Sequence, residues 1–233
     1  MIGTGTVSSP GIRVIITGTT GMVGEGVLLE CLGDSRVEAV LVINRKTIGI
    51  SNPKLTEIIH SDFYDLSAIE AQLTGYNACF FCLGISSVGI SAEQYYKVTY
   101  TLTMRVAATL SRLNPGMTFC YVSGGGTDRT EKGRSRWARV KGKTENDLMK
   151  LPFRRVYAFR PGFLKPVAGQ QHVHAFYRYI NWLYPLGRAL YPNGFNTLRE
   201  VALAMIQLAV GGSPTGEYPT DIITGKDMIQ LAQ

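Results

Sequence analysis

Long hydrophobic runs are missing from this chain of 233 residues, and so are the patterns by which cysteines bind metal. No apolar run reaches the roughly 20 residues that a membrane-spanning helix needs, so we expect no such helix. Cys79 and Cys82 have the spacing of a metal-binding pair, but they fall in an apolar strand, where residues three apart point to opposite faces. Because no second pair and no histidine pair accompanies them, zinc is not expected. We interpret all the cysteines as buried thiols of a reducing compartment, by default the cytoplasm: Cys31, Cys79, Cys82 and Cys120.

A secretory signal is missing as well. Residues 1–10 are small and polar, without the charged and apolar regions of such a signal, and we expect them to form a short disordered leader. With 45% hydrophobic and 18% charged residues, the chain from 11 to 233 suits a single domain with a sizeable core.

Acidic residues are too few to balance the bases, and the net charge is +7. Much of the excess lies in residues 128–143, where seven cations accompany two acids. Such a segment is compatible with an anionic substrate, with a nucleotide or nucleic acid, and equally with a solvated loop. Nucleic acid is not an expected partner, because no nucleic-acid motif accompanies the charge.

The sequence does contain a glycine-rich turn near its start. Val14, Ile15 and Ile16 form a β-branched apolar run that is typical of a buried strand, and the segment after the turn is helix-like. The turn between them has the spacing Gly-x-x-Gly-x-x-Gly, with Gly18, Gly21 and Gly24. A strand, a glycine turn and a helix in this order predict a dinucleotide site, because glycines let a pyrophosphate approach the backbone at the positive end of the helix.

The end of the second expected strand, residues 39–43, indicates which dinucleotide binds. An NAD site usually has Asp or Glu there to bond the ribose 2′-hydroxyl. Asn44, Arg45 and Lys46 stand there instead. Because an arginine can pair with a 2′-phosphate and a carboxylate would repel it, we expect NADP(H) to be preferred, with NAD(H) as an alternative. Ordinary solvated loop charges remain the other explanation.

Alternating strands and helices predict the fold class: an α/β, Rossmann-like, doubly wound parallel sheet of about seven strands with helices on both faces. The expected strands cover residues 14–16, 39–43, 55–59, 78–83, 117–122, 155–159 and 222–223. Ligands of such sheets lie beyond the carboxyl ends of the strands. The polar features and turns that follow these ends are Gly18, Asn44, Asp62, Gly84, Ser123 and Arg160.

Four motifs give the chain a family resemblance. They are the glycine turn from Thr17 to Gly24, Phe81-Cys82-Leu83-Gly84, Val140-Lys141-Gly142 followed by Glu145, and Phe159-Arg160-Pro161-Gly162. Together they resemble the atypical short-chain dehydrogenases/reductases over nearly the whole chain. Within that group the chain is similar to the Tat-interacting-protein branch and to NAD-dependent epimerase/dehydratase-like proteins.

The resemblance implies a bound NADPH and a set of residues around it. The implied cofactor-binding residues are Gly18, Thr19, Thr20, Gly21, Met22, Val23, Gly24, Asn44, Arg45, Lys46, Asp62, Leu83, Gly84, Ile85, Lys141, Pro161 and Gly162. Active members pair a tyrosine with a lysine four residues later, because the lysine lowers the pKa of the tyrosine that exchanges a proton with the substrate. Here Lys141 is present, but Trp137 occupies the tyrosine position and cannot shuttle a proton. Ser123 stands at the serine position, although the hydroxyl of many relatives lies further on, near Gly125 and Thr127.

Two functions remain open at this point. The chain is either an NADP-dependent oxidoreductase of an unknown small carbonyl or alcohol, or a non-catalytic NADPH sensor or protein-interaction module. In the first case another group supplies the proton; the candidates are Tyr95, Tyr96, His172, His174, Tyr177 and Tyr179. A substrate-side lid is expected around residues 165–200. Its aromatic part, residues 176–191, is compatible with core packing, a substrate pocket, a homodimer or protein interface, or a membrane surface.

Overall fold

The computed structural model describes residues 11–173, 184–211 and 218–233. The expected leader, residues 1–10, lies outside them. Strands and helices alternate along the chain. The strands are β1 Ile12–Thr17, β2 Val37–Asn44, β3 Leu55–Ile59, β4 Ala78–Phe81, β5 Thr118–Val122, β6 Arg155–Arg160, β7 Phe163–Lys165, β8 Phe195–Thr197 and β9 Ile222–Thr224. The α-helices are α1 Met22–Gly33, α2 Ala92–Tyr96, α3 Thr103–Leu113, α4 Arg136–Leu148, α6 Tyr184–Leu190, α7 Leu198–Val210 and α8 Gly225–Leu231. The 3₁₀-helices are η1 Ser67–Leu73 and η4 Pro192–Gly194, and η2 Lys97–Leu102 is a π-helix.

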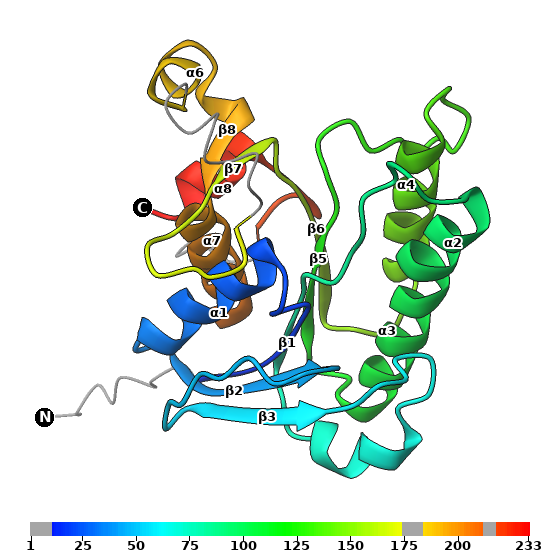
Figure 1. Cartoon of the computed structure of the whole chain (residues 1–233), viewed down its shortest axis with the longest axis vertical. Helices are drawn as coiled ribbons and strands as arrows, with labels where there is room; N and C mark the ends of the chain where they lie inside the picture. Colours follow the sequence, from blue (N-terminus) through cyan, green and yellow to red (C-terminus); the bar gives the residue numbers. More distant parts are fainter. Residues whose placement is uncertain (1–10, 174–183, 212–217) are drawn as a thin grey trace, which may run out of the picture.

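Seven of the strands form one parallel sheet in the order β3-β2-β1-β4-β5-β6-β9, which confirms the predicted fold class. Helices α1, α7 and α8 cover one face of the sheet, and α2, α3 and α4 cover the other (Figure 1). The strand side chains alternate between the two layers. Ile16 packs under α1 and α7, whereas its neighbour Ile15 packs under α3. The apolar runs are continuous because both faces of the sheet are buried.

Three of the four cysteines are buried as the sequence predicts, whereas Cys82 is only partly buried and lines a cavity. Cys79 packs in the layer under α3, and Cys82 contacts the opposite layer. All four are free thiols, and burial raises the pKa of each; that of Cys82 is raised to about 12. No helix in the described part of the chain is both long and apolar enough to cross a bilayer.

Capping side chains mark the starts of two helices. The Ser91 hydroxyl accepts the Gln94 N–H at 3.1 Å, and the long helix that it caps continues through the π-helical turn η2 into α3. Thr197 and Glu200 form a reciprocal cap of α7. The fourth strand is shorter than expected: it ends at Phe81, because the next residues turn across Gly18.

The sequence did not predict the parallel pair β7–β8, whose strands are three residues long. Such short strands carry no readable pattern. β8 falls within residues 165–200, where the sequence predicts a substrate-side lid, and β7 ends at the first of these residues. Tyr184 is buried there against Phe163 and Phe195, whereas Leu190 and Tyr191 of the same region are exposed.

Candidate functional site

A cavity of about 620 Å³ opens at the carboxyl ends of β1, β2 and β4. Its wall opposite the sheet comes from α2 and η2, through Gln94, Val98 and Leu102. The structure brings many of the predicted cofactor-binding residues together in its lining: Gly18, Thr20, Gly21, Asn44, Arg45, Asp62, Leu83, Gly84 and Ile85. The sequence missed Ile43, Ser61, Phe63, Tyr64 and Cys82, which also line it.

The glycine turn has the shape of a phosphate cradle. Gly18 has φ +75°, and a Cβ there would lie 2.7 Å from the Leu83 nitrogen. A Cβ on Gly24 would lie 2.2 Å from the Gly18 carbonyl oxygen, so the helix packs directly on the turn. Gly21 lines the cavity with its backbone, immediately before α1 begins. The free N–H groups of the first turn of α1 follow directly, and the cradle therefore fits a pyrophosphate.

Three of the predicted residues near the turn lie behind the cavity. Thr19 is buried, and its hydroxyl donates to the Asn44 side-chain oxygen at 2.8 Å. Met22 packs in the core, and Val23 packs against it. These residues fix the turn without lining the cavity.

A carboxylate that the sequence did not reveal approaches the end of β2 from the neighbouring strand. Glu57 of β3 accepts hydrogen bonds from the Asn44 amide at 2.9 Å, the Thr47 hydroxyl at 2.7 Å and the Ile48 N–H at 3.1 Å. Burial raises the pKa of Glu57, but the three hydrogen bonds outweigh it and the net direction is downward. This carboxylate is thus occupied by its own loop. Arg45 and Lys46 are exposed, and Arg45 alone of the two lines the cavity.

At the end of β5 the hydroxyls of Ser123 and Thr127 are hydrogen-bonded to each other. The Ser123 Oγ lies 2.9 Å from the Thr127 Oγ1, and the Thr127 hydroxyl donates to the Gly124 carbonyl at 2.8 Å. Each hydroxyl has one proton, so Ser123 donates to Thr127. The Ser123 oxygen can still accept a hydrogen bond, but its proton is already used.

Lys141 reaches the same strand end from α4. Its Nζ donates to the Ser123 carbonyl at 2.8 Å and to the Val122 carbonyl at 3.3 Å, and it lies 5.6 Å from the centre of the Tyr121 ring. Burial lowers the pKa of Lys141 to about 8, and the Glu145 carboxylate opposes that shift only in part.

Trp137, at the tyrosine position, makes packing contacts and has no group that could transfer a proton. Its ring lies against the glycine turn after β5: a Cβ on Gly126 would be 3.5 Å from it, and one on Gly124 would be 3.9 Å away. Gly126 also has φ +84°. The indole therefore covers a turn that has no side chains.

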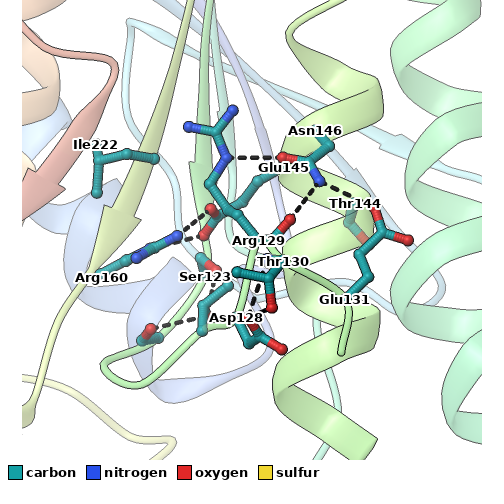
Figure 2. Close-up of polar contacts among 12 residues, drawn as sticks. Ser123, Asp128, Arg129, Thr130, Glu131, Thr144, Glu145, Asn146, Arg160 and Ile222 are labelled. Carbon is teal, nitrogen blue, oxygen red and sulfur yellow. Dashed lines mark hydrogen bonds and ion pairs between the residues drawn. The ribbon is translucent and has the colours of Figure 1, made fainter. Parts of the chain in front are cut away.

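Residues 136–143 of the basic segment belong to α4, and its first part, residues 128–135, is held to this helix by polar contacts (Figure 2). Arg129 and Glu131 both bind the Asn146 side chain, at 2.7 and 2.9 Å. Behind them the buried Glu145 accepts two hydrogen bonds from Arg160, at 3.0 and 2.5 Å, and this pair joins α4 to the end of β6 (Figure 2).

The predicted nicotinamide-side residues lie near this strand end, outside the cavity lining. The Pro161 carbonyl accepts the Gly125 N–H at 2.9 Å. A Cβ on Gly162 would lie 2.4 Å from the Gly194 oxygen, so Gly162 allows close backbone packing.

Tyr95, Tyr96 and His172 are the candidate proton donors that the structure describes. Tyr95 is buried, and burial raises its pKa, which disfavours it as an acid near pH 7. Tyr96 is exposed and its ring lies 4.9 Å from that of Tyr100. His174, Tyr177 and Tyr179 lie outside the described residues.

His172 belongs to the segment after β7, residues 166–173, which contacts the start of α1. The Gln171 and His172 N–H groups both donate to the buried Glu25 carboxylate at 2.7 Å. The Gln170 amide donates to the Met22 carbonyl at 2.6 Å. The described beginning of the expected lid is thus fastened to the helix that follows the glycine turn.

Comparison with known proteins identifies the family and similar folds. Residues 14–130 match the family model described as "NAD dependent epimerase/dehydratase family". Protein HTATIP2 of Rattus norvegicus is 26% identical over 153 residues, which are 65% of this chain and 62% of the rat protein. Protein fmp52, mitochondrial, of Emericella nidulans is 29% identical over 165 residues, 68% of each chain. The Bordetella bronchiseptica enzyme WbmF, solved in complex with NAD+, has a TM-score of 0.64 at 18% identity and covers 97% of this chain and 78% of its own.

Proposed function

This chain belongs to the NAD dependent epimerase/dehydratase family, and on that basis we propose that it is an NADP(H)-dependent oxidoreductase of a small carbonyl or alcohol substrate. One observation carries the proposal: a cavity of about 620 Å³ lies over the glycine turn, Arg45 lines it, and the Glu57 carboxylate of the neighbouring strand is bound by Asn44 and Thr47. A nicotinamide cofactor, when bound, supplies or accepts the hydride.

The residues of the chain then have distinct roles. The turn from Gly18 to Gly24 and the start of α1 would hold the pyrophosphate. Arg45 would pair with the 2′-phosphate, and Lys46 would add positive charge nearby. Asp62, Leu83, Gly84 and Ile85 would surround the adenosine. Lys141 would hold the nicotinamide ribose, with Pro161 and Gly162 beside the ring.

A second candidate is a protein that binds NADPH without turnover. Two contacts favour it: Trp137 packs on the glycine turn, and the Ser123 proton is donated to Thr127. Steady oxidation of NADPH by any carbonyl substrate, absent without protein, would eliminate this alternative.

We further propose a reducing compartment, the cytoplasm, which the four free thiols support. The Emericella relative carries the word mitochondrial in its name, so fractionation of the cell is the direct test. A homodimer or protein partner stays a prediction, to be tested by the mass of the purified protein in solution.

The decisive experiment is calorimetric titration with NADPH and NADH at fixed ionic strength. Charge-assisted bonds of about 1.5–3 kcal/mol predict that the native protein binds NADPH about 10- to 100-fold more tightly than NADH. Arg45→Asp should abolish this preference, because a carboxylate repels the 2′-phosphate. Lys46→Asp is the matched control: it changes the same charge one residue away from the cavity lining and should shift selectivity much less.

Equal selectivity of the native and Arg45→Asp proteins would contradict the 2′-phosphate assignment. Failure of both coenzymes to bind would contradict the proposed function itself.

A further inference from the structure

The hydroxyl and ring groups around the end of β5 do not supply a labile proton. Trp137 has none, and the Ser123 proton is directed through Thr127 to the Gly124 carbonyl. Tyr121 is almost fully buried beside Lys141, and burial raises its pKa far above the ordinary value. A phenol in that state does not exchange protons near pH 7.

Lys141 is the remaining titratable donor at this strand end. Its Nζ is bound by two backbone carbonyls, and no carboxylate lies within ion-pair distance of it in residues 11–173, 184–211 and 218–233. The nearest acid along its helix, Glu145, gives both oxygens to Arg160. A partly buried ammonium that is held by backbone carbonyls and has no ionic partner is a candidate functional group.

We propose that Lys141 itself exchanges the proton with the substrate oxygen, in the role that tyrosine has in active relatives. This proposal rests on the proposed oxidoreductase function. Four charged or titratable groups surround the lysine: Glu145 one turn along α4, Arg160 beyond it on β6, Tyr121 on β5 and Tyr95 on α2 behind Tyr121.

The chemical step balances with the nicotinamide as reductant. The carbonyl carbon of the substrate gains a hydride, and the π electron pair moves to the oxygen. The oxygen takes a proton from the Lys141 ammonium, so an N–H bond breaks and an O–H bond forms. Lys141 is left neutral and regains a proton from water; oxidation of an alcohol runs the same step in reverse.

The first test measures the lysine directly, without substrate. The protein is labelled with ¹³C at the lysine ε-carbon, and the Lys141 signal is identified by its loss in Lys141→Arg. We expect this signal to titrate with a midpoint of about 8, as burial without an ionic partner predicts. Exposed lysines should titrate above about pH 10. A Lys141 midpoint near 10 or higher would overturn the proposal.

The second test separates proton transfer from binding. Lys141→Arg keeps the charge and the donors, but an arginine does not release a proton near neutral pH. At saturating NADPH, reduction of a panel of aldehydes and ketones should fall about 100-fold or more. A calorimetric titration of the variant sets the NADPH concentration needed, so that a change in cofactor affinity is not mistaken for a loss of proton transfer. Lys143→Arg, two residues along the same helix and paired with Asp147, is the control and should keep its rate.

The outcomes are distinct. Retained reduction by Lys141→Arg would overturn the proposal and identify another donor, and so would a native protein that binds NADPH but reduces none of the panel between pH 6 and 9. Absence of NADPH binding would instead reject the proposed function on which it rests. In the native protein, the reduction rate should fall as pH rises through the Lys141 midpoint.

Discussion

At the scale of single residues, the replacement of a tyrosine by Trp137 changes what its neighbours can do. The indole covers the turn through Gly124 and Gly126, where no side chain competes for the space. Beside it, Ser123 can act toward a ligand only as a hydrogen-bond acceptor, because its proton is donated to Thr127. The expected serine–tyrosine–lysine set has therefore lost its phenol, and the proton of its serine is already committed.

Restoring the phenol tests this description. Trp137→Tyr should create or raise carbonyl reduction about tenfold or more, because Lys141 lies one helical turn away and its charge lowers the pKa of a nearby phenol. The measurement is NADPH oxidation over a panel of carbonyl substrates. Trp137→Phe, which has a ring without a hydroxyl, is the control and should not raise the rate. If the native protein already reduces a substrate quickly and Trp137→Tyr brings no gain, a tyrosine is not what the site lacks.

At the scale of elements, helix α4 positions the site because it packs very closely against the backbone of the loop after β5. Trp137, Lys141 and Glu145 are four residues apart and so share one face of the helix. Gly142 lies against the loop after β5: a Cβ there would be 1.8 Å from the Asp128 oxygen and 2.8 Å from the Arg129 nitrogen. Both are backbone atoms, which cannot rotate away as a flexible side chain can.

The substitution Gly142→Ala therefore has two opposing effects on stability. Alanine favours a helix by about 1 kcal/mol over glycine, but forcing a methyl group against the backbone costs about 1–3 kcal/mol or more. We expect a net loss of unfolding free energy, measured by urea unfolding. Gly33→Ala, at the last residue of α1 with nothing within 4 Å of the added Cβ, is the matched control and should be neutral or stabilising. Equal stability of the two variants would contradict the close packing of α4.

At the scale of the whole molecule, several carboxylates bind donors in the folded state that the unfolded chain lacks. Those with a lowered pKa are Asp34, Glu57, Asp65, Asp128, Asp147 and Asp227. Asp147 joins two helices, since it accepts from Lys143 of α4 and from the Tyr100 hydroxyl of η2, both at 2.8 Å. Partial burial raises its pKa, but the hydrogen bonds from Lys143, Lys150 and Tyr100 outweigh this and hold the pKa well below 3.8.

Stability should therefore fall in acid. A folded-state pKa below the unfolded one gives stabilisation that is complete above about pH 4–5 and is lost as pH falls through the folded-state value. Asp147→Asn should lower the unfolding free energy by about 1 kcal/mol at pH 7, since the network is partly exposed, and by less at pH 3. Urea unfolding across this range measures the difference. A pH-independent loss in Asp147→Asn would contradict the linkage.

The sequence by itself determined the order and type of the main elements. The strands are apolar runs, the glycine turn joins one strand to one helix, and Ser91 and Thr197 mark helix starts; each of these signals lies within a few neighbouring residues. A parallel sheet then brings its strand ends to one edge, so Gly18, Asn44 and Asp62 could be placed at one cavity without coordinates. The roles of these residues toward a cofactor stay predictions.

Only the tertiary structure decided which groups are free to act. Glu57 reaches Asn44 from the next strand, Arg160 occupies Glu145, and Trp137 covers a turn more than ten residues before it. The short pair β7–β8 joins segments about thirty residues apart. Contacts of this kind depend on packing between distant segments and leave no local pattern in the sequence. The donors and acceptors that they occupy, and those that they leave free, determine the chemistry of the site.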